Sequence, residues 1–140
     1  MSSANGSLVI LVVEDNLGDV MLFQEAVEFT QTSAAVHVAG DGGDAMRFLL
    51  HQGRHAEAPR PDVIVLDLNL PIKNGQQVLM EVASDPALNT IPVAILTTSI
   101  SDTCLCELYP PGRCLYFTKT DDFKRLQDIV RQIAAHASVA

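Results

Sequence analysis

The chain has 140 residues, of which 48% are hydrophobic, 19% charged and 5% aromatic. A chain of this length has the size of one globular domain. It buries about two thirds of the surface that its unfolded form exposes, which excludes a two-domain architecture and a disordered chain. Seventeen acidic against nine basic side chains give a net charge of −8. This charge disfavours binding to nucleic acid, because a phosphate backbone would be repelled.

Neither a membrane span nor a secretory signal is expected. No apolar stretch approaches the roughly 18 residues that cross a bilayer. Residues 1–7 contain no Lys or Arg, and the apolar run that follows ends at once in acidic residues, unlike a signal peptide. We therefore expect a cytoplasmic protein with one domain over residues 1–140, a short disordered N-terminus at 1–7 and no output domain.

Regular structure begins with a strand followed by a helix. Residues 8–13, Leu-Val-Ile-Leu-Val-Val, form a continuous aliphatic run, which is typical of a strand covered on both faces in a parallel sheet. From Asn16 the period changes, because Val20, Phe23 and Val27 recur three and four residues apart with polar residues between them. This spacing predicts an amphipathic helix directly after the strand.

The same alternation continues along the chain, with turns rich in Gly, Pro, Asn and Asp and one polar loop at 53–61. Further strands are predicted at 35–39, 63–66, 92–96 and 114–118, and further helices after Asp41, between Gly75 and Asp85, from Ser101 or Asp102, and from Asp121 or Asp122. The fourth helix must be short, because Pro110 and Pro111 break it after about two turns. Five strand–helix pairs predict an α/β fold: a doubly wound, five-stranded parallel sheet with helices on both faces.

Polar side chains follow four of the predicted strands at their carboxyl ends. Glu14 and Asp15 follow the first strand, Asp67 the third, Thr97 the fourth and Lys119 the fifth. Ligands of an open parallel sheet bind at this edge, so we expect these side chains to converge there. Three carboxylates held together raise each other's pKa unless a cation neutralises them, and an all-oxygen site suits Mg2+. The alternative is that the three acids are separate loop residues.

This constellation resembles the receiver domain of two-component response regulators over nearly the whole chain. The segments that carry the resemblance are Val12-Val-Glu-Asp-Asn16, Val65-Leu-Asp-Leu-Asn-Leu-Pro71 with Asn74-Gly75 behind it, Ile95-Leu-Thr-Thr-Ser99 and Tyr116-Phe-Thr-Lys119. The resemblance implies the flavodoxin-like receiver fold. It also implies a phosphoacceptor protein that receives a phosphoryl group from a histidine kinase and is not itself an enzyme acting on other substrates.

The resemblance further implies a role for each acidic residue at the sheet edge. Asp67 would accept the phosphoryl group. Asp15, Asp67 and the backbone carbonyl of Asn69 would bind Mg2+, and Glu14 would hold a water molecule on the metal.

The resemblance assigns the remaining polar residues to the phosphoryl group and to the switch. Thr97 would hydrogen-bond a phosphoryl oxygen, Lys119 would pair with it as a positive charge, and Thr97 and Tyr116 would form the switch. Family members usually carry proline after this lysine, commonly with a cis peptide bond, but here the residue is Thr120. We expect a trans bond there, because a cis bond before a non-proline residue costs about 2.5 to 4 kcal/mol.

A narrower resemblance concerns residues 58–71 and 85–92. These segments are similar to those of single-domain response regulators paired with phytochrome-type sensor kinases, which implies a kinase partner of that type. Because no output domain is expected, the output must be a protein partner.

The face made by the fourth helix, fifth strand and fifth helix is predicted to be the output face and a homodimer contact. The short fourth helix carries Ile100, Cys104, Leu105 and Leu108, more apolar residues than one buried stripe of two turns requires. Simple burial of this helix beneath residues 109–111 is the alternative. The segment 108–113 also stands where the family usually has a longer helix, so the shape of this face is open.

Three other functions are weighed against the receiver interpretation. A magnesium-dependent aspartyl phosphohydrolase would ordinarily need a second aspartate two residues after the nucleophile, where this chain has Asn69. A flavodoxin-like cofactor binder would need a phosphate loop rich in Ser, Thr and Gly after the first strand, and residues 14–17 have the wrong charge. A receiver-like scaffold that works without phosphorylation stays open, because Thr120 is atypical.

Overall fold

The computed structural model describes residues 7–70, 74–98, 109 and 112–139. Its strands are β1 (Leu8–Val13), β2 (Ala34–Ala39), β3 (Val63–Leu66), β4 (Val93–Thr97) and β5 (Cys114–Thr118), and its helices are α1 (Leu17–Phe29), α2 (Gly42–Leu49), α3 (Gly75–Ser84) and α4 (Phe123–Val139), with a 3-10 turn η1 (Gly53–His55). Every strand lies within one residue of its predicted range. The predicted fourth helix falls at 99–108, outside the described residues, so the helix labelled α4 is the predicted fifth.

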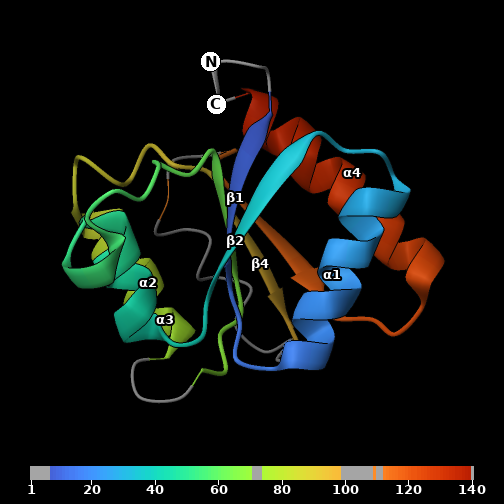
Figure 1. Cartoon of the computed structure of the whole chain (residues 1–140), viewed down its shortest axis with the longest axis horizontal. Helices are drawn as coiled ribbons and strands as arrows, with labels where there is room; N and C mark the ends of the chain where they lie inside the picture. The colour runs from blue at the N-terminus through green and yellow to red at the C-terminus, as the bar shows by residue number, and fades with distance from the viewer. Residues whose placement is uncertain (1–6, 71–73, 99–108, 110–111, 140) are drawn as a thin grey trace.

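The five strands form one parallel sheet in the order β2-β1-β3-β4-β5, which confirms the predicted doubly wound α/β fold. Helices α2 and α3 cover one face of the sheet, and α1 and α4 cover the other (Figure 1). The strand order reverses between β1 and β3, since the chain moves outward to β2 from β1 and then returns to β3 on its other side. Ligands bind at the carboxyl ends of the strands at such a reversal.

The helices begin where short polar side chains accept backbone N–H groups. Asn16 Oδ1 accepts from the backbone of Asp19 (3.0 Å), and Asn74 forms a reciprocal capping box with Gln77 at the start of α3. At the last helix, Asp122 Oδ1 accepts from the backbone of Lys124 (3.0 Å), so Asp122 is the cap of the two predicted candidates.

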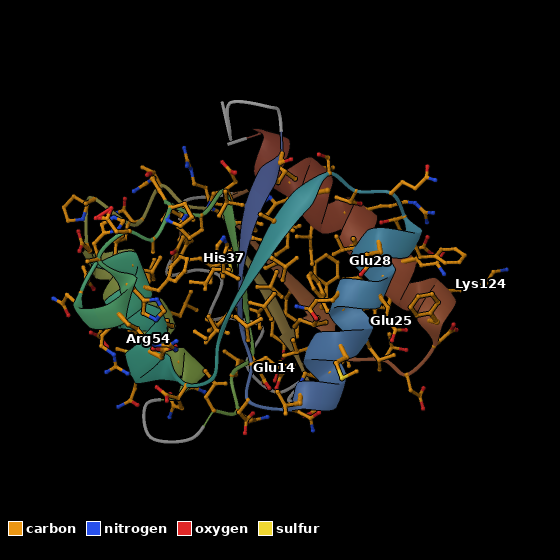
Figure 2. The ribbon with its side chains drawn as sticks, viewed as in Figure 1. Glu14, Glu25, Glu28, His37, Arg54 and Lys124 are labelled. Carbon is orange, nitrogen blue, oxygen red and sulfur yellow. The ribbon has the colours of Figure 1, made fainter. Side chains whose placement is uncertain are left out.

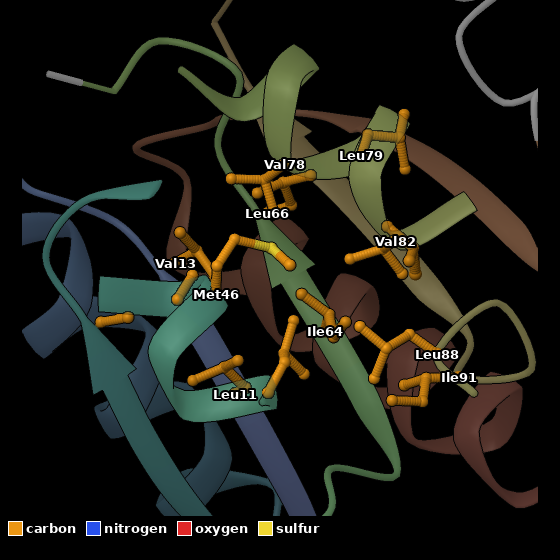
Figure 3. Close-up of a cluster of buried hydrophobic side chains, with 14 of the residues drawn as sticks. Leu11, Val13, Met46, Ile64, Leu66, Val78, Leu79, Val82, Leu88 and Ile91 are labelled. Atoms are coloured by element: carbon orange, nitrogen blue, oxygen red, sulfur yellow. The ribbon is translucent and has the colours of Figure 1, made fainter. Parts of the chain in front are cut away.

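Two hydrophobic clusters fill the space between the sheet and its helices. Because side chains alternate along a strand, Leu11 and Val13 of β1 pack under α2 and α3 (Figure 3), whereas Ile10 and Val12 pack under α1 and α4. All four residues of β3 are buried, as expected for the central strand of a sheet that is covered on both faces. This packing fixes the positions at which the strands end.

Other predictions concern the ends and connections. Residues 1–6 of the predicted disordered N-terminus lie outside the described residues, whereas the Ser7 hydroxyl lies 2.9 Å from that of Ser33. None of the peptide bonds between described residues is cis, which confirms the trans bond expected between Lys119 and Thr120. Among the helices that the structure describes, none is both long and apolar enough to span a membrane.

Candidate functional site

Backbone hydrogen bonds fix the residues that follow β1, β3 and β5. The Glu14 N–H donates to the Ala39 carbonyl (3.0 Å), and the Asp67 N–H donates to the Val13 carbonyl (3.1 Å). The Lys119 N–H donates in the same way to the carbonyl of Thr97 (2.9 Å). The sheet therefore delivers the predicted residues to one edge, where Figure 2 shows Glu14 beside the start of α1.

Glu14, Asp15 and Asp67 form an acidic cluster in which one carboxylate oxygen of each residue lies within 4.8 Å of the others. Glu14 and Asp67 are buried and Asp15 is exposed. Burial raises the pKa of Glu14, and the charge of Asp67 raises it further, against the hydrogen bond from Lys119. An all-oxygen donor set with a surplus of negative charge fits a hard divalent cation such as Mg2+ or Mn2+.

Asp67 is held by donors on both of its oxygens. Oδ1 accepts from Thr97 Oγ1 (3.0 Å) and from the backbone N–H of Asn69 (3.0 Å). Oδ2 accepts from Lys119 Nζ (3.0 Å). Thr97 is fully buried, so its hydroxyl is fixed by its surroundings. These contacts orient one buried carboxylate at the end of the central strand.

Lys119 is the cation that links the acids of this edge. Its ammonium group contacts Glu14, Asp19 (2.8 Å) and Asp67 (3.0 Å). Burial alone would lower the pKa of Lys119, but the hydrogen bonds to the three carboxylates raise it above its ordinary value. Lys119 is therefore charged at neutral pH and partly offsets the acidic cluster.

Asp19 is the site residue that the sequence analysis missed. It lies in the first turn of α1, four residues after Asp15 in the chain. A helix that begins at the carboxyl end of β1 places its first turn at the same sheet edge, so an acid at that position was a usable signal. The amphipathic pattern of α1 explained its apolar positions only and assigned no role to Asp19.

Gly75 allows α3 to begin against the backbone of the site. A Cβ atom at this position would lie 2.1 Å from the Asp67 carbonyl oxygen and 2.5 Å from the Leu68 Cα. The Gly75 N–H donates to the Leu68 carbonyl (3.0 Å). Only glycine therefore fits between this helix and the strand end that carries Asp67.

The two remaining predicted residues are Asn69 and Tyr116. Asn69 is exposed and contributes its backbone N–H to Asp67, and Tyr116 lies half-buried in β5 opposite Ile95 of β4. Tyr116 packs against the cluster under α2 and α3. Tyr116 therefore lies on the strand next to the one that ends in Thr97.

A parallel five-stranded sheet whose carboxyl edge gathers an acidic pair, a buried aspartate, a threonine and a lysine defines a receiver-type α/β domain. The chain belongs to the response regulator receiver domain family, which it matches over residues 10–131. Receiver domains are signalling modules of two-component systems, and the resemblance identified from the sequence is confirmed.

Several relatives are similar to this chain over most of its length. Response regulator Rcp1 of Synechocystis sp. is 39% identical over 130 residues, which cover 93% of this chain and 88% of the relative. The phosphorylated cyanobacterial phytochrome response regulator RcpA has a solved structure with a TM-score of 0.84 and 41% identity, covering 96% of this chain and 97% of that chain. The Mn2+-bound form of Rcp1 has a TM-score of 0.80 and 40% identity, covering 91% and 92%.

Proposed function

We propose that Asp67 accepts a phosphoryl group from the phosphohistidine of a histidine kinase. The observation that carries this proposal is the environment of Asp67, a buried carboxylate fixed by Thr97, Asn69 and Lys119 next to the acidic cluster. A carboxylate oxygen attacks phosphorus, the bond from phosphorus to the histidine nitrogen breaks, and its electron pair returns to the imidazole. The product is an acyl phosphate on Asp67 and a free histidine on the kinase.

A divalent cation in the acidic cluster would neutralise the charge that accumulates on the transferring group. Asp15 and Asp67 supply the side-chain oxygens that would bind it, Glu14 would hold a water molecule on the metal, and the backbone carbonyl of Asn69 is expected as a further ligand. We propose Mg2+ as the ion, and the Mn2+-bound form of the relative Rcp1 supports a divalent cation. Lys119 supplies a fixed positive charge that pairs with the phosphoryl oxygens.

Phosphorylation would change the shape of the domain through Thr97 and Tyr116. The acyl phosphate adds nearly two negative charges to an edge that is already acidic, so the Thr97 hydroxyl and the Lys119 ammonium are drawn toward it. Tyr116 lies on the strand next to β4, where it can follow the movement of Thr97. This coupling would carry the signal toward β5 and α4.

The kinase partner that we propose is of the phytochrome type, and the transfer would take place in the cytoplasm. The similarity to RcpA, a cyanobacterial phytochrome response regulator, supports this partner. A further solved relative is the bacteriophytochrome response regulator AtBRR, at 33% identity and a TM-score of 0.75. A homodimer through the face of the predicted fourth helix, β5 and α4 stays a prediction, because Leu105 and Leu108 lie outside the described residues.

The test is phosphorylation of the full chain with acetyl phosphate and Mg2+, followed by intact-mass measurement. Wild type should gain one phosphoryl group and Asp67→Asn should gain none. Asp62→Asn is the matched control, since Asp62 directly precedes β3 where Asp67 directly follows it. The control should be labelled like wild type.

Two results would contradict the assignment. Label that persists in Asp67→Asn would place the phosphoacceptor at another residue. A wild type that takes no label from acetyl phosphate or from a phosphorylated kinase would favour the phosphorylation-independent scaffold.

A further inference from the structure

Asp19 lies beside the proposed phosphoacceptor but outside the acidic cluster. Its backbone N–H donates to Asn16 Oδ1 (3.0 Å), so the start of α1 fixes its place. Its Oδ2 lies 2.8 Å from Lys119 Nζ, a contact between residues 100 positions apart in the chain. Among the described residues, the acidic cluster consists of Glu14, Asp15 and Asp67 only. Asp19 is therefore a partner of the lysine without being a member of the cluster.

The contacts of Lys119 use all of its donors. An ammonium group has three protons, and Lys119 contacts three carboxylates. Two of these carboxylates, Glu14 and Asp67, belong to the acidic cluster. A divalent cation in the cluster would attract the negative charge of these two groups and repel the ammonium, which weakens both contacts. Of the three contacts, only the one with Asp19 involves a carboxylate outside the cluster, so a cation there does not compete with the ammonium for it.

We propose that Asp19 is a positioning residue that retains Lys119 at the sheet edge when a divalent cation occupies the acidic cluster. This role rests on the proposed function, because it requires the cation site. With Asp19 as its partner, Lys119 leaves Glu14 and Asp67 to the cation and stays within reach of the phosphoryl group. Asp19 acts through Lys119 and does not itself contact the reacting atoms.

The exposure of the pair separates this role from a structural one. The Asp19 side chain is 41% exposed and that of Lys119 is 16% exposed. An ion pair with one partner so exposed contributes little to the stability of a fold. Substitution of Asp19 should therefore leave the domain folded and act on cation binding, where the ammonium and the cation compete for the same two carboxylates.

The test is a Mn2+ titration of the full chain, followed by electron paramagnetic resonance of the free ion, in a double-mutant cycle. Asp19→Asn should weaken Mn2+ binding by about threefold to tenfold, because Lys119 then has only Glu14 and Asp67 as partners. In the Lys119→Gln background the same substitution should have an effect no larger than that of Glu25→Gln. Glu25 is an exposed acid further along α1 and serves as the matched control. Asp19→Glu should restore most of the affinity.

The possible results distinguish a failure of the positioning role of Asp19 from a failure of the cation site. An equal loss of affinity from Asp19→Asn with and without Lys119 would make Asp19 a general negative charge and overturn its positioning role. No loss in either background would remove Asp19 from the site. A wild type that binds no Mn2+ would overturn the cation site itself, and with it the proposed function of the cluster.

Discussion

Asp44 and Asp67 are both buried aspartates, and their surroundings differ in charge. Asp44, in the first turn of α2, accepts from Arg54 (2.7 Å) and from His55 Nε2 (2.9 Å), with Arg47 at 3.6 Å. Asp67 instead shares one ammonium group with two other carboxylates. The charge of Asp44 is balanced by its neighbours, whereas the edge around Asp67 carries surplus negative charge.

This difference in charge balance distinguishes an acid that stabilises the fold from one at a ligand-binding site. Burial alone would raise the pKa of Asp44, but the hydrogen bonds from His55 and Arg54 hold it below its ordinary value. For Glu14, next to Asp67, burial and repulsion prevail and its pKa is raised. A buried acid with a raised pKa in a ligand-binding edge is typical of a functional site.

The largest effect is expected on the free energy of unfolding, when Asp44 and Asp67 are each replaced by asparagine in separate variants. Asp44→Asn should lower the free energy of unfolding by about 1 to 2 kcal/mol, because Arg54 and His55 lose a charged acceptor. Asp67→Asn should leave it unchanged or raise it, because one repelling charge is removed from the acidic cluster. Urea unfolding at neutral pH without divalent cations measures both values. Equal losses in the two variants would contradict the comparison.

The second effect is stabilisation by Mg2+, which should depend on the acidic cluster alone. Mg2+ at ten times its dissociation constant should stabilise the wild type by about 1.4 kcal/mol, since it binds the folded form. Asp15→Asn should abolish this shift, and Glu57→Gln, which removes an exposed loop acid, should retain it. The magnesium-dependent change in melting temperature is the quantity to compare, because Asp15→Asn can raise the melting temperature by itself. A full shift in Asp15→Asn would place the ion elsewhere.

The sequence predicted the residues at the carboxyl edge of the sheet better than it predicted the contacts of Asp44. Short apolar runs predicted the strand ends to within one residue, and the residues that follow parallel strands must meet at one edge. Asp67, Thr97 and Lys119 were found for this reason. The contacts of Asp44 with Arg54 and His55 depend on how the loop after α2 folds back, and a polar loop shows no periodicity from which that can be predicted.

Asp19 was missed for a related reason. Its contact with Lys119 joins residues 100 positions apart and depends on the direction in which the first turn of α1 faces. The apolar pattern of α1 predicts the face that packs on the sheet, but it does not show which polar residue of the first turn reaches the end of β5. Such contacts require the packed structure.

The smallest effect is the pH dependence of stability, which should have opposite signs at the two regions. The folded pKa of Glu14 lies above its ordinary 4.5, so the folded chain binds more protons between these two values. The metal-free protein should therefore gain stability from Glu14 as the pH falls through the raised pKa toward 4.5. Glu14→Gln should remove this gain in urea unfolding measured from pH 7 downward.

Asp44 should act in the opposite direction and at lower pH. Its folded pKa lies below the ordinary 3.8, so its contribution to stability is complete above pH 3.8 and is lost as the pH falls through the folded value. The difference in unfolding free energy between wild type and Asp44→Asn should therefore shrink below pH 4. A difference that stays constant down to pH 2 would mean that Asp44 stabilises the fold without its charge. The contrast with the acidic cluster would then rest on packing and not on charge balance.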